Sequence, residues 1–182
     1  MTRPQTTLLV TGTVAVLVLA IVAAVTIGRD DEEAGTDAHV HIEPISTADE
    51  VAVAAMAGIH TWTPATQQSP WDALHAISDR LTGKLAEAAS SRPESYPTPR
   101  QWQSWARAGD RVIGAAELSS EQEPVTQDAA TAQRSVQVRQ RVLHADGATT
   151  PLEPITIAVE LERVGQDWKA ANYRYTSIGS AR

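Results

Sequence analysis

The sequence predicts an α+β protein, with one N-terminal transmembrane helix followed by three helices packed on a four-stranded antiparallel sheet. Three observations predict this class. An uncharged apolar stretch covers residues 7–28. Apolar residues recur at helical spacing between residues 47 and 108, and alternate with polar residues from about residue 111 onward. Helices followed by strands, without alternation of the two, indicate helices gathered on one face of an antiparallel sheet.

The apolar stretch from Thr7 to Gly28 consists mostly of Leu, Val, Ile and Ala. Roughly 20 helical residues cover the ~30 Å hydrocarbon core of a bilayer. The run ends at Arg29 and four acidic residues, without the small-residue pattern of a signal-peptide cleavage site. We therefore expect an uncleaved anchor. Because Arg3 precedes it, the positive-inside bias predicts a cytoplasmic tail at residues 1–6 and a domain outside the plasma membrane.

The composition excludes several kinds of function. The 182-residue chain carries a formal net charge of −7, which argues against nucleic acid as a partner because phosphate binding needs a basic surface. It contains no cysteine, so disulfides and cysteine-type zinc sites are excluded. No phosphate loop, dinucleotide fingerprint or hydrolase motif occurs in the sequence. We expect no cofactor and no enzymatic activity.

Two short patterns near the membrane each have a functional and a plain interpretation. One face of the span carries small residues at a spacing of four: Ala20, Ala24 and Gly28. This spacing lets a second helix pack closely and so allows a homo-oligomer. The plain interpretation is that such spacing is common in Ala-rich spans. The acidic linker at residues 29–46 carries side chains that bind transition metals: Asp37, His39 and His41. A flexible tether does not pre-position ligands, so we expect no metal there.

The domain, expected at residues 47–178 before a tail at 179–182, begins with helices. Thr47 and Glu50 form a capping box, which predicts a helix over 47–61. Ser69 as N-cap and Pro70 at the first position predict a second helix over 70–88. A short third helix ends near Gly109. The expected buried face of the second helix contains Trp71, Leu74, Ile77, Leu81 and Leu85.

Four strands follow, expected at residues 111–118, 133–144, 155–162 and 168–177. In the second of them Val136, Val138 and Val142 share one face, because side chains alternate along a strand. Asp146-Gly147 is a turn signal between the second and third strands. Antiparallel pairing then predicts cross-strand ion pairs on the outer face, between Arg139 and Arg141 on one strand and Glu160 and Glu162 on the next.

This layout resembles the nuclear transport factor 2-like superfamily. The resemblance rests on the helix pair Thr47–Thr61 and Pro70–Ala88, and on the closing strand Asp167-Trp-Lys-Ala-Ala-Asn-Tyr-Arg-Tyr. It implies that the helices pack into the concave face of a strongly curved, cone-like sheet. The arrangement of span, acidic tether and domain is similar to that of membrane-anchored actinobacterial members. These are Mce-associated proteins and components of conjugation or type IV secretion, whose first helix connection the stretch 62–73 resembles.

Enzymatic members of that superfamily place His, Asp or Tyr inside the cone. Asp72, His75 and Asp79 share one face of the second predicted helix, which suits a carboxylate-supported base, but a solvated helix flank explains the same pattern. His60, at the end of the first helix, is a further candidate base. A histidine there also interacts favourably with the helix dipole.

The tryptophans have two interpretations as well. Buried aromatic residues ordinarily belong to the core, yet two or three of them can line a pocket for an apolar ligand. The candidates are Trp62, Trp71, Trp102, Trp105 and Trp168.

The sequence therefore favours a non-catalytic, single-pass membrane-anchored interaction or scaffold module in a bacterial cell-envelope assembly, with other envelope proteins as partners. The first alternative is a binding domain for a lipid or small hydrophobic ligand. The second is a small hydrolase or isomerase that uses Asp72 and His75.

Overall fold

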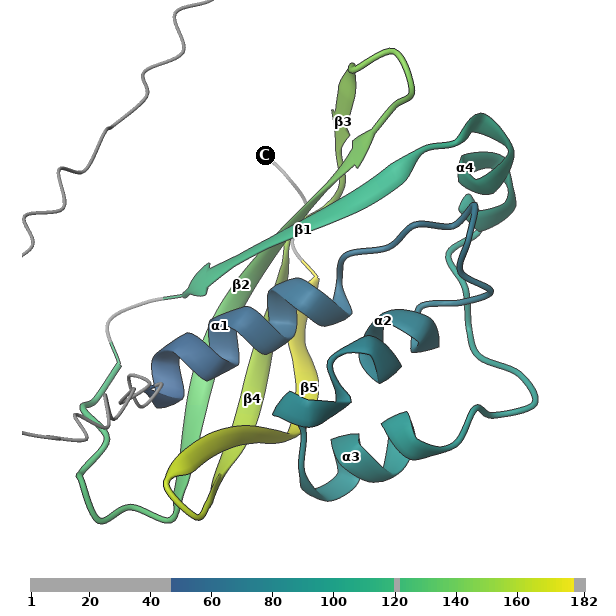
Figure 1. The fold of residues 1–182 in the computed structure, drawn as a ribbon. Helices are drawn as coiled ribbons and strands as arrows, with labels where there is room; N and C mark the ends of the chain where they lie inside the picture. Colours follow the sequence, from purple (N-terminus) through teal and green to yellow (C-terminus); the bar gives the residue numbers. More distant parts are fainter. Residues whose placement is uncertain (1–46, 120–121, 179–182) are drawn as a thin grey trace, which may run out of the picture. The chain divides into compact units, whose positions relative to one another are not determined.

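The computed structural model describes residues 47–119 and 122–178, in which the helices precede the strands (Figure 1). The helices are α1 (Ala48–Ile59), α2 (Trp71–Ala76), a short 3-10 helix η1 (Ser78–Arg80), α3 (Gly83–Ser90) and α4 (Trp102–Ala108). The strands are β1 (Arg111–Leu118), β2 (Thr131–Leu143), β3 (Thr149–Pro151), β4 (Ile155–Val164) and β5 (Asp167–Ile178).

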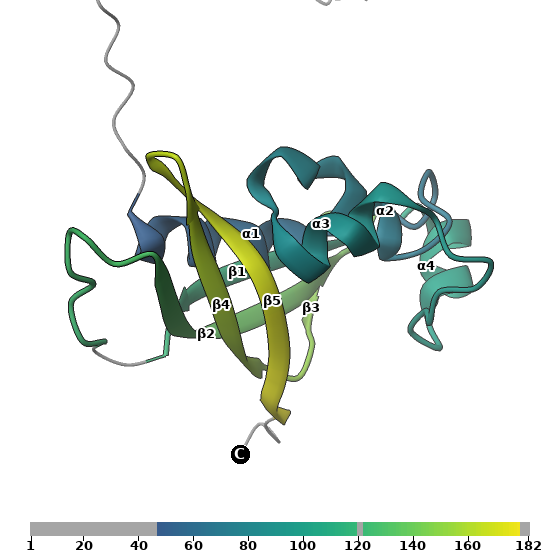
Figure 2. The ribbon, with the colours of Figure 1, turned by 90° about the horizontal axis from the view of Figure 1, so that it is seen from below.

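The sheet has the order β1-β2-β4-β5, with β3 paired to the end of β2, and every pair is antiparallel. Figures 1 and 2 show α1 across one face of this sheet, with α2 and α3 beside it toward β5. The prediction of four strands and three helices was wrong, since the described residues contain five strands and four α-helices. The extra strand, β3, has only three residues and ends at a proline, so it leaves no alternating pattern in the sequence.

The predicted helix over residues 70–88 is interrupted from Ile77 to Thr82, and the last part of this interruption contacts β5. Leu81 forms a parallel bridge with Ala170, and the Thr82 amide donates to the Ala170 carbonyl at 2.9 Å. The next residue, Gly83, has a φ of +50°, and a Cβ on it would lie 3.3 Å from the Ala171 carbonyl oxygen. The α-helix has already ended at Ala76, and this contact with the strand separates η1 from α3.

The start of α1 confirms the predicted capping box. The Glu50 amide donates to the Thr47 hydroxyl at 3.2 Å, and the Thr47 amide donates to the Glu50 carboxylate at 2.8 Å. The predicted end near Gly109 is also confirmed, because this residue caps α4 in the left-handed region with a φ of 73°.

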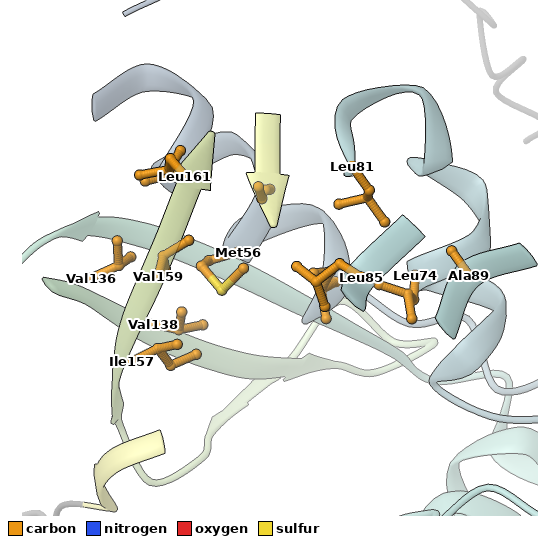
Figure 3. Packing of buried hydrophobic residues seen from close by; sticks show 14 of the residues in the cluster. Met56, Leu74, Leu81, Leu85, Ala89, Val136, Val138, Ile157, Val159 and Leu161 are labelled. Atoms are coloured by element: carbon orange, nitrogen blue, oxygen red, sulfur yellow. The ribbon is translucent and has the colours of Figure 1, made fainter. Parts of the chain in front are cut away.

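The core lies between the helices and one face of the sheet. Figure 3 shows Met56 of α1 between strand side chains such as Val138 and Val159 and helix side chains such as Leu74 and Leu85. Met56 is fully buried there. A smaller apolar cluster at the α4 end contains Trp105, Val112 and Val142.

The predicted ion pairs of Arg139 and Arg141 with β4 were wrong, because the register differs from a tight hairpin. β4 begins only after Pro154, and Ile155 already pairs with Val138. The two arginines lie beyond this pairing. Arg139 instead forms an ion pair of 2.7 Å with Glu117 on β1.

In the two described ranges, no helix is both long and apolar enough to cross a bilayer. The predicted span at residues 7–28, its small-residue face, the linker at 29–46 and the tail at 179–182 lie outside the described residues.

Candidate functional site

A pocket of about 550 Å³ lies where the C-terminal end of α1 meets β5 and the proline-rich loop before α4. We call it the aromatic pocket. Its rings are those of His60, Trp62, Tyr96, Tyr173 and Tyr175. The remaining lining is Ile59, Thr98 and the prolines at positions 70, 97 and 99.

The strand period brings two of the rings together. Tyr173 and Tyr175 are two residues apart on β5, so their side chains point to the same face of the sheet. Their ring centroids are 5.6 Å apart and their planes are inclined by 82°. Tyr173 is partly buried, whereas Tyr175 is 52 % exposed and forms the rim of the pocket.

His60 is buried at the end of α1 and forms part of the pocket wall. Its Nδ1 lies 2.8 Å from the Met56 carbonyl oxygen, and its Nε2 lies 3.4 Å from the Tyr175 hydroxyl. A carbonyl only accepts hydrogen bonds, so Nδ1 carries the proton, and in the neutral ring Nε2 accepts from Tyr175. Burial lowers the pKa of His60, against the opposing effect of the Met56 hydrogen bond. The ring is therefore neutral at physiological pH.

The carbonyls at the end of α1 are held by side chains and by the following residue. Helix C-termini leave these carbonyls without intrahelical partners. Here Thr61 donates from its hydroxyl to the Ala57 carbonyl (2.8 Å) and from its backbone amide to the Gly58 carbonyl (3.1 Å). The Trp62 indole donates to the Ile59 carbonyl (2.8 Å). The side-chain amide of Gln140 donates to the His60 carbonyl (2.8 Å). This end of the helix is thereby fixed on the sheet, so the pocket wall that it forms is preorganised.

None of the described residues that line the aromatic pocket carries an ionised side chain. Its described lining contains no Asp, Glu, Lys or Arg. Burial raises the pKa of Tyr173, with the neighbouring Tyr175 adding to the effect. Burial raises the pKa of Tyr96 in the same way. These hydroxyls are therefore protonated at neutral pH, and the pocket offers apolar surface with a few uncharged polar atoms.

The predicted tryptophan set is spread over the molecule. Trp62 lines the pocket, and Trp102 packs behind it with a centroid separation of 5.9 Å. Trp105 belongs to the small apolar cluster at the α4 end. Trp168 packs against the Arg163 guanidinium, whose central carbon lies 4.7 Å from the centroid of the Trp168 ring. Trp71 donates its indole N–H to the Ala88 carbonyl at 2.7 Å, which joins α2 to α3.

Asp72, His75 and Asp79 do not form a catalytic group with one another. The Asp72 carboxylate accepts from the Gln68 and Ser69 amides at 2.8 and 3.1 Å and pairs with Arg92. Partial burial alone would raise the pKa of Asp72, but the hydrogen bonds from Ser69, Arg92 and Gln68 outweigh it and lower that pKa. The carboxylate thus holds the backbone that leads into α2.

The other two members of the predicted set face elsewhere. His75 directs Nδ1 to the Ala89 carbonyl at 2.9 Å and stacks on Trp71 with a centroid separation of 4.8 Å. Asp79 is exposed, and its backbone carbonyl accepts from Lys169 at 2.8 Å. Within residues 47–119 and 122–178, no group of three or more His, Asp or Glu side chains is placed to hold a metal ion.

A hydrogen-bonded chain that the sequence reasoning missed joins three strands. The buried Asp110 carboxylate, just before β1, lies 3.1 Å from Nδ1 of His144, whose Nε2 lies 2.9 Å from the Thr150 hydroxyl on β3. In some enzymes a carboxylate orients an imidazole, and the imidazole activates a hydroxyl group as a nucleophile. Thr150 is exposed on a three-residue strand, and these contacts link the β2–β3 hairpin to the residue before β1.

Comparison with known proteins adds little to this geometry. No protein-family model matches the chain, and no curated protein matches it. Among solved structures, the chain is similar to the crystal structure of the intermembrane space region of the chloroplast protein ARC6. That similarity has a TM-score of 0.36 and 14 % sequence identity, over 70 % of this chain and 92 % of the other. It does not bear on the nuclear transport factor 2-like resemblance, which stays a prediction.

Proposed function

We propose that this chain is a non-catalytic binding module of a bacterial cell envelope, and that its aromatic pocket holds a lipid or another small hydrophobic ligand. The pocket itself carries the proposal. Its volume of about 550 Å³ falls inside the range of roughly 300–1,000 Å³ that is typical of small-molecule sites. Such sites combine apolar and aromatic walls with a few well-placed polar groups.

The polar atoms of the pocket suit orientation of a ligand rather than chemistry. The Nε2 atom of neutral His60 accepts from the Tyr175 hydroxyl, and the tyrosine hydroxyls donate and accept. A general base needs an orienting group and a titration near the working pH. The Met56 carbonyl orients the His60 ring, but burial lowers its pKa, and the described lining holds no carboxylate to stabilise the imidazolium that a base becomes.

Binding of an apolar fluorescent probe tests the proposal. Thr98 lies exposed at the pocket lining, so Thr98→Trp should block the cavity while sparing the core. Ser95→Trp, at an exposed position of the same loop outside the lining, is the matched control. We expect N-phenyl-1-naphthylamine to bind the full chain and the Ser95 variant equally, and the Thr98 variant about tenfold more weakly. Equal binding to all three proteins would contradict the proposal.

Attachment to the plasma membrane is a second part of this proposal. It rests on the apolar composition of residues 7–28 and on the resemblance to membrane-anchored members of the superfamily. Carbonate washing of membranes from the producing cells tests it. We expect the chain to stay in the pellet and Val18→Arg to shift it to the supernatant, because a central Arg costs about 2.5–3.5 kcal/mol of insertion. Release of the unchanged chain would contradict attachment.

A partner protein is the second candidate ligand, and the position of β5 favours it. β5 is an edge strand, and the described bridge on its outer side is at Ala170. An edge strand can accept a further strand from another protein. Co-purification from detergent-solubilised membranes tests this: a chain that always elutes alone as a monomer would contradict it.

A further inference from the structure

The rings of the aromatic pocket stand at steep angles to one another. The planes of His60 and Tyr175 are inclined by 86° with centroids 6.2 Å apart, and those of His60 and Tyr173 by 61° with centroids 6.3 Å apart. Trp62 and Tyr96 complete the ring set. A cation within about 6 Å of the centroid of a Trp or Tyr ring is attracted by the negative face of the ring. Four such rings therefore line one cavity.

The end of α1 lies in the wall of the same cavity. A helix macrodipole is negative at its C-terminus, although uncharged donors bond to the last carbonyls of α1. No basic residue occupies the last turn of α1, and His60 contributes no charge in its neutral form. Lys and Arg are also missing from the described lining. The described residues of this wall therefore carry no positive charge that would cancel the negative end of the helix dipole.

The kind of cation is restricted by the missing carboxylates. A primary amine that enters the pocket would lose hydration from three N–H groups, and burial of unpaired polar groups is costly. Neither Asp nor Glu is present in the described lining to accept these hydrogen bonds. A quaternary ammonium has no N–H group and an apolar surface of methyl groups, so it gives up no N–H hydrogen bonds on entering such a site, and the ring faces attract its charge.

We propose that the ligand of the aromatic pocket carries a quaternary ammonium group. This inference rests on the proposed binding function and names its ligand class. The trimethylammonium head lies among the rings at the end of α1, and the rest of the cavity accommodates its attached chain. Such a head occurs in phosphocholine lipids and in free small molecules, and the two sources share this chemistry.

An isosteric pair separates the charge of the ligand from its shape. Choline and 3,3-dimethylbutan-1-ol have the same branched head, but only choline is charged. Both are titrated against N-phenyl-1-naphthylamine bound to the full chain in dodecyl maltoside, a detergent without an ammonium group. We expect the concentration of choline that displaces the probe to be at least about fivefold lower than that of the alcohol, because cation–π attraction favours the charged head. Equal displacement would overturn the cation preference and leave the hydrophobic pocket standing, whereas failure of the probe itself to bind would overturn both.

Substitution at the rim assigns the effect to a ring. Tyr175 is 52 % exposed, so its replacement should spare the fold. We expect Tyr175→Leu to remove about threefold or more of the preference for choline and Tyr175→Phe to keep it, since the ring and not the hydroxyl attracts the cation. An unchanged preference in the Leu variant, or the same loss in both variants, would contradict the proposal.

The source of the head is tested with short-chain lipids below their micelle concentration. Tighter binding of dihexanoylphosphatidylcholine than of choline would identify the lipid headgroup, and the reverse would identify a free small molecule. Dihexanoylphosphatidylglycerol, which has the same chains without the ammonium group, is the control. If it binds as tightly as the choline lipid, the proposal is wrong.

Discussion

The side-chain amide of Gln140 donates a hydrogen bond of 2.8 Å to the backbone carbonyl of His60, in the interior between β2 and the end of α1. Gln140 belongs to the inner face of β2, where the neighbouring inward positions are Val138 and Val142. The amide satisfies a helix-end carbonyl that would otherwise be buried without a partner. This contact holds the wall of the aromatic pocket on the sheet.

Replacement of Gln140 should therefore destabilise the fold and the pocket together. Gln140→Leu leaves the His60 carbonyl without its donor, and we expect a loss of about 1–3 kcal/mol in the free energy of unfolding. Gln137→Leu, on the opposite face of the same strand, should change it by less than about 0.5 kcal/mol. Urea unfolding of the full chain in detergent measures both. Similar values for the two variants would show that the Gln140 contact is not important.

The close approach of β1 to α1 gives a second prediction. A Cβ on Gly114 would lie 2.8 Å from the His60 carbonyl oxygen and 3.1 Å from that of Ala57. Backbone cannot move aside as a side chain can, so we expect Gly114→Ala to destabilise by about 1–3 kcal/mol. Gly58→Ala is the control, because its Cβ meets no backbone atom and only the Ile77 side chain, at 3.2 Å. A thermal-melt series in which the Gly58 variant is the less stable would contradict this account of the interface.

The buried His60 predicts a pH dependence of stability. Its pKa is lowered from the usual 6.5 by burial, so the unfolded chain takes up a proton at a higher pH than the folded one. His60 therefore does not change the stability above about pH 6.5. The stability falls as the pH drops from 6.5 toward the lowered pKa that His60 has in the folded chain. We expect His60→Asn, which keeps an N–H donor for Met56, to reduce the stability difference between about pH 7.5 and about pH 5.5. Unfolding curves with the same difference in both proteins would exclude His60 as its source.

The Asp110–His144–Thr150 chain predicts unequal effects along its length. Asp110 is buried, so His144→Ala deprives a buried carboxylate of its partner, and we expect a loss of about 1–3 kcal/mol. Thr150→Val should cost less than about 0.5 kcal/mol because Thr150 is exposed. Chemical denaturation of the two single variants tests whether the His144 variant loses more stability than the Thr150 variant. A larger loss in the Thr150 variant would contradict this account.

Local sequence signals predicted the individual elements well where the cause was local. The capping box at Thr47 and Glu50 and the left-handed cap at Gly109 depend on neighbouring residues, and both are present in the structure. Between α2 and α3, Leu81 forms a bridge with Ala170, 89 residues later in the chain, and no periodic pattern contains that information. The register of β4 against β2 likewise depends on a connection longer than the Asp146-Gly147 turn suggested.

The candidate site was only partly accessible from the sequence. His60 and Trp62 were named, but Tyr96, Tyr173 and Tyr175 were not. The two β5 tyrosines at a spacing of two residues, and a tyrosine within a run of prolines, were the available signals. What joins them is the long-range packing of β5 and the loop against the end of α1, which composition and periodicity do not encode.

The central claim, that the aromatic pocket holds a hydrophobic ligand, is tested most directly by mass spectrometry of the full chain extracted from the membranes in which it is produced. We predict a bound apolar molecule in near-stoichiometric amount on the unchanged chain and on Ser95→Trp, and its loss from Thr98→Trp. An unchanged chain that carries no such molecule, or a Thr98 variant that retains it in full, would contradict the account.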